Sequence, residues 1–65
     1  MIRRTMTEKG ISAEKLASDA AVSLSTINRA MAGKRINRNN LERICYVLNI
    51  RVADVLQDQE RRSES

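Results

Sequence analysis

Only three residues separate two short segments that the sequence pattern predicts to be helices, residues 13–20 and about 24–32. Each segment follows a serine, Ser12 or Ser23, whose side chain is suited to capping the start of a helix. Apolar residues recur along one face of each segment at spacings of three and four residues. Two short helices joined so tightly must cross steeply, and this crossing constrains the fold more than any other feature of the chain.

Glycine and asparagine mark where the other predicted helices end or begin. Gly10 and Gly33 suit the left-handed turn that follows a helix, and Asn49 can adopt the same conformation. A first helix is therefore predicted over residues 2–9, and Asn37 is expected to cap a fourth. The apolar stripe of this fourth helix is Leu41, Ile44, Cys45 and Leu48.

The remaining chain predicts one small domain followed by a polar tail. A short fifth helix is expected to hold Val55 and Leu56. Residues 58–65 contain no apolar side chain and are expected to fray, so residues 1–57 are expected to form the domain. The absence of proline and the scarcity of glycine and aromatic residues favour helix over sheet. The predicted fold class is therefore all-α, with five helices.

The amino-acid composition excludes several classes of function. The 65 residues include no His, Trp, Phe or Pro, one Tyr and one Cys. Zinc sites of the Cys/His type, Ser-His or Cys-His nucleophile pairs and aromatic platforms for single strands are therefore ruled out. We expect no catalytic site, no metal and no cofactor. One Cys cannot form an internal disulfide, so a reducing compartment is expected, and no apolar run is long enough for a membrane span.

The positive charge of the chain is unevenly distributed. Residues 29–51 carry a net charge of +5, and the other residues sum to −1. The six cations of this basic segment, set against the single acid Glu42, are Arg29, Lys34, Arg35, Arg38, Arg43 and Arg51. Such a basic excess is typical of a surface that binds a polyanion, and a basic loop kept for solubility is the alternative.

The ordered spacing of these features resembles the helix-turn-helix of phage-repressor and Cro-type regulators, the xenobiotic-response-element family. The matching residues, which span about residues 2–57, are Leu16-Ala17, Val22-Ser23, Ile27, Gly33-Lys34, Leu41, Ile44, Leu48-Asn49-Ile50 and Val55-Leu56. The resemblance implies a compact five-helix bundle of the lambda-repressor-like DNA-binding type, with the helix-turn-helix at helices 2 and 3. Two residues depart from the family pattern. Ala21 stands where the family usually has Gly, and Ala13 stands where it often has a Gln that contacts a phosphate.

The predicted third helix presents a short polar face. With Ile27 directed into the core, a rotation of about 100° per residue places Ala30 and Met31 on the same side. The residues that this rotation directs outward or sideways are Ser25, Asn28, Arg29 and Ala32, and Leu24 is expected to be exposed at the start of the helix. Arg suits guanine, Asn suits adenine, Ser suits either, and Leu suits the methyl group of thymine. All of these residues except Ala32 are therefore candidate base contacts, and the small Ala32 permits close approach.

The loop after this helix faces the sugar-phosphate backbone in a helix-turn-helix protein. Lys34, Arg35 and Arg38 are therefore candidate phosphate contacts, and Asn37 can add a hydrogen bond. Further candidates lie at the starts of the helices, namely Ser12, Ser23 and Thr26.

The resemblance implies a sequence-specific transcriptional regulator that binds double-stranded DNA, with repression as the expected role. Relatives dimerise on palindromic operators with half-sites about 34 Å apart, so a homodimer is expected. The apolar candidates for that contact are Tyr46, Val47, Val52 and the end of the fifth helix. The resemblance also implies a cytoplasmic, nucleoid-associated protein, bacterial or phage-encoded. The alternative is a helical protein-interaction module, antitoxin-like or an adaptor, that does not bind DNA.

Overall fold

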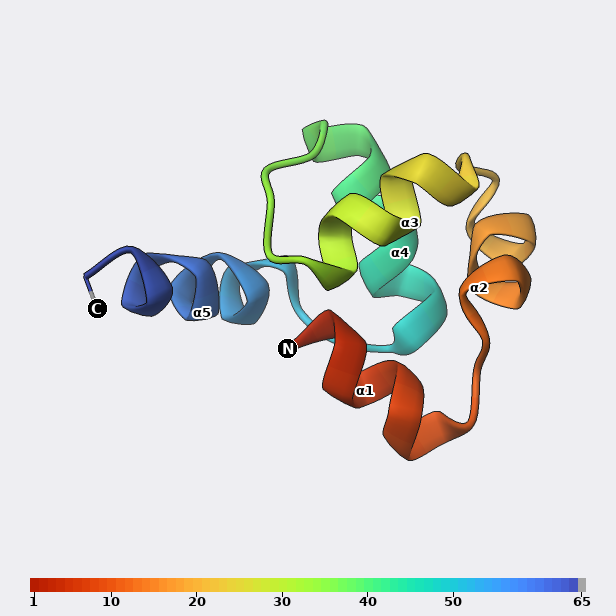
Figure 1. The fold of residues 1–65 in the computed structure, drawn as a ribbon, viewed down its shortest axis with the longest axis horizontal. Helices are drawn as coiled ribbons and strands as arrows, with labels where there is room; N and C mark the ends of the chain where they lie inside the picture. The colour runs from red at the N-terminus through yellow and green to blue at the C-terminus, as the bar shows by residue number, and fades with distance from the viewer. Residues whose placement is uncertain (65) are drawn as a thin grey trace.

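The computed structural model describes residues 1–64, which form five α-helices with no strand among them. The helices are α1 (Ile2–Lys9), α2 (Ala13–Ala20), α3 (Leu24–Met31), α4 (Arg38–Leu48) and α5 (Val52–Glu64). Figure 1 shows α1 to α4 gathered together, with α5 extending to one side. The prediction of an all-α fold with five helices is confirmed, and α3 ends one residue before the predicted Ala32.

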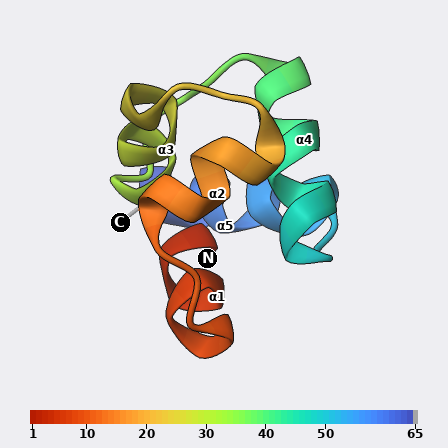
Figure 2. The ribbon, with the colours of Figure 1, turned by 90° about the vertical axis from the view of Figure 1, so that its right-hand side faces the viewer.

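The helix-turn-helix pair lies at the centre of the packing. α2 packs against both α3 and α4, α1 packs against α3, and α5 packs against α4 (Figure 2). The buried core residues are Ile2, Met6, Leu16, Ala17, Ala20, Ile27, Ala30, Leu41, Ile44, Cys45, Leu48 and Val55. Each fully buried Leu or Ile stabilises the fold by about 1.5–3 kcal/mol relative to leaving it exposed. Burial also raises the pKa of the Cys45 thiol, which disfavours its reactive thiolate form.

Side-chain oxygens cap three helices at their N-termini, as predicted. Ser12 Oγ accepts a hydrogen bond from the Lys15 N–H, and Ser23 Oγ accepts one from the Thr26 N–H, both at 3.1 Å. Asn37 Oδ1 accepts a hydrogen bond from the Asn39 N–H at 2.8 Å. Each cap satisfies a backbone donor that the helix itself leaves without a partner.

A left-handed residue follows each of the first four helices. These residues are Gly10, Ala21, Gly33 and Asn49, with φ between 57° and 77°. Gly adopts this conformation without steric penalty, and Asn tolerates it. Ala21, at φ 57°, carries the penalty of a Cβ atom, about 1–2 kcal/mol. Ala21 thus adopts the left-handed conformation at the position where the family pattern usually has Gly.

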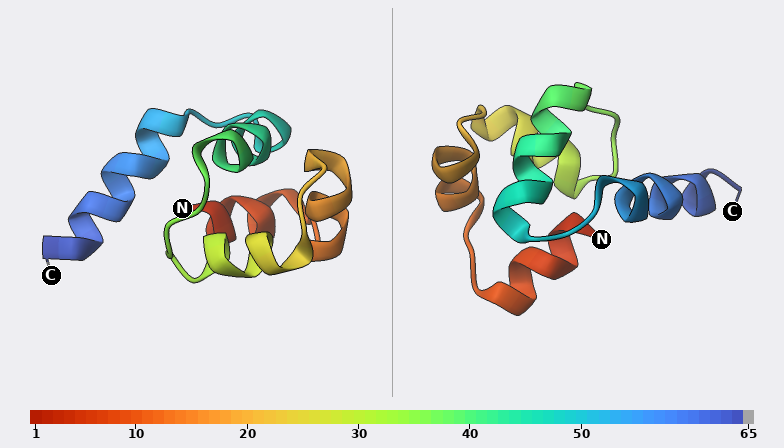
Figure 3. Two further views of the ribbon diagram at one scale, coloured as in Figure 1. Left: turned by 90° about the horizontal axis from the view of Figure 1, so that it is seen from above. Right: turned by 180° about the vertical axis from the view of Figure 1, so that it is seen from behind.

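The fifth helix is longer than the sequence pattern predicts. α5 continues through residues 58–64, which were expected to fray, and Ser65 lies outside the described residues. The expected helix was too short because it relied on the apolar stripe, which does end near Leu56. Fraying of residues 58–65 stays a prediction. Residues 58–64 are rich in Gln, Glu and Arg, which lose little rotamer freedom in a helix, and they contain no Gly or Pro. The two views in Figure 3 show this part of α5 projecting beyond the other helices.

None of the helices in residues 1–64 is both long enough and apolar enough to cross a membrane.

Candidate nucleic-acid interface

Packing against the core sets the rotation of α3 and hence the face that it exposes. Ile27 is fully buried and Ala30 is buried, so the opposite side of the helix faces solvent. The four candidate base contacts all lie on this exposed surface: Leu24, Ser25, Asn28 and Arg29. Leu24 is 44% exposed and lies outside the buried core. The predicted direction of these side chains is confirmed.

The basic candidates lie in the loop that follows α3 and at the start of α4. Lys34 and Arg35 are exposed in this loop. Arg38 is the first residue of α4, and its Nε lies 3.4 Å from Glu42 Oε1, one turn along the same helix. Both partners of this ion pair are largely exposed, so it contributes little to stability. A phosphate can therefore replace Glu42 at Arg38 with little loss.

The capping residues retain hydrogen-bond donors beside their structural role. A serine hydroxyl that accepts a backbone N–H still has its own proton to donate. Ser12 is in this situation, and Asn37 keeps its NH₂ group because only its Oδ1 serves the cap. Ser23 and Thr26 share a hydrogen bond of 2.9 Å between their hydroxyl oxygens, so only one hydroxyl proton of that pair remains for another acceptor.

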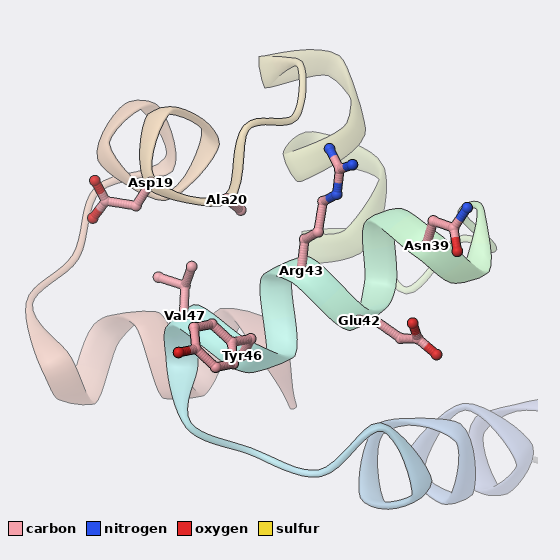
Figure 4. A pocket seen from close by; sticks show the side chains of 7 residues that line it. All are labelled: Asp19, Ala20, Asn39, Glu42, Arg43, Tyr46 and Val47. Carbon is pink, nitrogen blue, oxygen red and sulfur yellow. The ribbon is translucent and has the colours of Figure 1, made fainter.

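One contact at the turn was not predicted from the sequence. Arg43, on α4, extends toward the turn between α2 and α3 (Figure 4), and its Nη1 donates to the carbonyl oxygen of Ala21 at 3.4 Å. This bond ties α4 to the left-handed residue of the helix-turn-helix. The only signal in the sequence was the place of Arg43 in the basic segment, which gave it no specific role.

An open groove lies between α2 and α4. It is lined by Asp19, Ala20, Asn39, Glu42, Arg43, Tyr46 and Val47 (Figure 4). Its charged side chains already have partners within the chain, because Asp19 pairs with Lys15 at 3.3 Å and Glu42 pairs with Arg38. Tyr46 is 87% exposed, and it and Leu24 are the exposed large apolar side chains in the part of the chain whose side chains are described. That part holds no group of His, Cys, Asp and Glu suited to a metal ion.

Comparison with known proteins agrees with this geometry. A family model described as a Cro/C1-type HTH DNA-binding domain matches residues 1–60. The match includes both helices of the motif, the basic loop and most of α5. No curated protein and no solved structure matches the chain.

Proposed function

Because the chain belongs to the family of Cro/C1-type HTH DNA-binding domains, we propose that it is a transcriptional repressor that reads the major groove with α3. DNA binding follows from the family, and the repressor role and the groove are our proposal. The observation that carries it is the face of α3 opposite Ile27, which presents short polar side chains and one Arg to solvent. A helix with such a face fits the width of the major groove.

Four residues of α3 are proposed to contact base edges. Arg29 suits the O6 and N7 atoms of guanine, and Asn28 suits the N6 and N7 atoms of adenine. Ser25 can bond to either base, and Leu24 can contact the methyl group of a thymine. These contacts would set the sequence preference.

A second set of residues is proposed to hold the phosphate backbone on either side of α3. Lys34, Arg35 and Arg38 would bind phosphates by charge. The hydrogen-bonding members of the set are Ser12, Ser23, Thr26 and Asn37, which lie at or near the N-termini of α2, α3 and α4. Phosphate contacts of this kind fix the register of the helix on the duplex and carry no sequence information themselves.

The proposed active form is a homodimer on a palindromic operator. A single eight-residue α3 can contact only a few base pairs, which supplies little affinity alone. The exposed Tyr46, the half-buried Val47 and Val52, and the projecting α5 are the candidate contacts between the two copies. The proposed location is the cytoplasm of a bacterial cell, at the nucleoid.

Selection from a random duplex library, followed by footprinting, tests the proposed function. We expect enrichment of a two-fold symmetric sequence whose half-sites are one helical turn apart, about 34 Å. The Arg29→Ala variant, carried through the same selection, should lose the preference at one position of each half-site. If no motif is enriched by the unsubstituted chain, the protein-interaction module becomes the better interpretation.

A further inference from the structure

The first four helices end in the same backbone motif, known as the Schellman motif. In each, the left-handed residue donates to the carbonyl three residues before it, and the next residue donates to the carbonyl five residues before itself. These longer bonds join Ile11 to Met6, Val22 to Ala17, Lys34 to Arg29 and Ile50 to Cys45, each at 3.0 Å. The motif sets the side chains of the two joined residues beside each other, and an apolar contact commonly forms there.

Three of the four joined pairs follow this rule. The earlier residue of each is buried, and the later one is half-buried and packed against the core: Met6 with Ile11, Ala17 with Val22, and Cys45 with Ile50. The pair at the end of α3 does not follow it, because Arg29 and Lys34 are both charged and both exposed. The chain therefore has cationic residues at the two joined positions of α3, where α1, α2 and α4 have apolar residues.

No acidic side chain within residues 1–58, whose side chains the structure describes, forms an ion pair with either cation. The ion pairs in that range involve the Met1 amino group, Lys15 and Arg38, and none involves Arg29 or Lys34. The negative end of the α3 dipole favours each cation separately. It does not remove the repulsion between them, which an anion bound to both would do.

We propose that Arg29 and Lys34 form one coupled DNA-contact site, in which Arg29 reaches a base edge and Lys34 binds the adjoining phosphate. The proposal rests on the proposed function, because it takes a DNA duplex as the anion. It adds that the end of α3 is built for binding rather than for stability. Bound DNA removes the repulsion that the free domain tolerates.

Grafting the apolar pair of α1 onto α3 tests the stability half of this proposal. The double variant Arg29→Met/Lys34→Ile copies the Met6 and Ile11 pair at the equivalent positions. We expect its melting temperature in the absence of DNA to exceed that of the unsubstituted chain by about 2–5 °C. The matched control Arg51→Met/Arg35→Ile removes the same charge from exposed positions outside the motif while leaving Arg29 and Lys34 in place, and should bring no such gain. A lower melting temperature for the grafted pair would mean that the helix dipole dominates, and would overturn the proposal.

A double-mutant cycle tests the coupling. Affinity is measured on a duplex of about 30 base pairs carrying the selected sequence, for Arg29→Met, Lys34→Ile and the double variant. Each single variant loses one DNA contact and also the gain that binding brings by removing the repulsion between the two cations. The double variant loses both contacts but loses that gain only once. The loss of the double variant should therefore be smaller than the product of the single losses by about threefold or more. In the control pair, Arg29→Met with Arg35→Ile, the losses should multiply.

The outcomes separate this proposal from the function on which it rests. If the losses of affinity of the Arg29 and Lys34 single variants multiply in the double variant, as in the control pair, the coupling is overturned while DNA binding is left intact. An unsubstituted chain that binds neither the selected duplex nor a mixed-sequence duplex at low salt would overturn the proposed function and the coupled site together. Coupled losses together with the raised melting temperature would support the proposal.

Discussion

At the scale of single residues, Ala21 is the residue of the turn whose backbone conformation is strained. Its φ of 57° places the Cβ atom close to the following carbonyl oxygen, which costs about 1–2 kcal/mol. The surrounding contacts nevertheless hold it in place, because its N–H bonds to Ser18 and its carbonyl accepts from Arg43. The strain is therefore local and can be relieved by one substitution.

Ala21→Gly is expected to raise the free energy of unfolding by up to about 1 kcal/mol and to leave DNA binding intact. Gly removes the steric penalty, while its greater freedom in the unfolded chain offsets part of the gain. Urea denaturation measures the difference. The neighbouring Ala20→Gly is the control. Because Ala20 is helical and buried, this change should lower the free energy of unfolding by about 1 kcal/mol. A loss of similar size at residue 21 would show that the turn is not left-handed in solution.

Arg29 and Arg35 are expected to differ in the kind of binding that they support. Arg29→Ala should weaken the free energy of binding to the preferred duplex by about 1–3 kcal/mol and relax the preference at one base position. Arg35→Ala should weaken binding to every sequence alike and lower the slope of log affinity against log salt by about one unit. Titrations on preferred and mixed-sequence duplexes at several salt concentrations separate the two effects. Both residues are exposed, so both variants should keep the helical content of the parent chain and should not melt at a lower temperature.

At the scale of the helices, what the sequence predicted depended on how local each signal is. Capping hydrogen bonds span two or three residues, so Ser12, Ser23 and Asn37 marked the helix starts correctly. The length of α5 was underestimated because the prediction used only the spacing of apolar residues. A polar extension of a helix has no such spacing.

The bond from Arg43 to Ala21 spans 22 residues and depends on how α4 lies against α2, which no local pattern encodes. The facing of α3 was predictable because Ile27 fixes it. Whether that face contacts bases is still a prediction.

The tie between α4 and the turn predicts a small but specific effect of removing Arg43. Arg43→Met keeps the length of the side chain and removes the donor, and we expect the free energy of unfolding to fall by about 0.5–1 kcal/mol. Arg43→Lys should retain part of this contribution. Arg51→Met is the matched control, because Arg51 is also exposed and basic but forms no such bond with a residue in the described part of the chain. Equal effects of Arg43→Met and Arg51→Met on urea denaturation would show that the contact does not stabilise the turn.

At the scale of the whole molecule, size limits what one chain can do on DNA. The described chain extends 32 × 23 × 18 Å, and its longest dimension includes the projecting α5. One turn of B-DNA is about 34 Å long, so a single copy that presents the short α3 covers less than one turn. The small core also leaves little stability to lose, because domains of this size are stabilised by only about 3–5 kcal/mol. We therefore propose that affinity at an operator comes from a second copy rather than from a larger interface on the first.

We therefore expect two chains to occupy one two-fold symmetric site. Sedimentation of the complex should give two copies per duplex, and the footprint should protect both half-sites equally. Inserting about five base pairs between the half-sites turns one of them to the opposite side of the duplex, so affinity should fall toward that of an isolated half-site. An insertion of about ten base pairs returns both half-sites to the same side of the duplex but increases the distance between them. It therefore distinguishes a rigid dimer from two independently bound monomers. A footprint on one unsymmetrical half-site with a single copy bound, unaffected by either insertion, would show that the chain acts as a monomer.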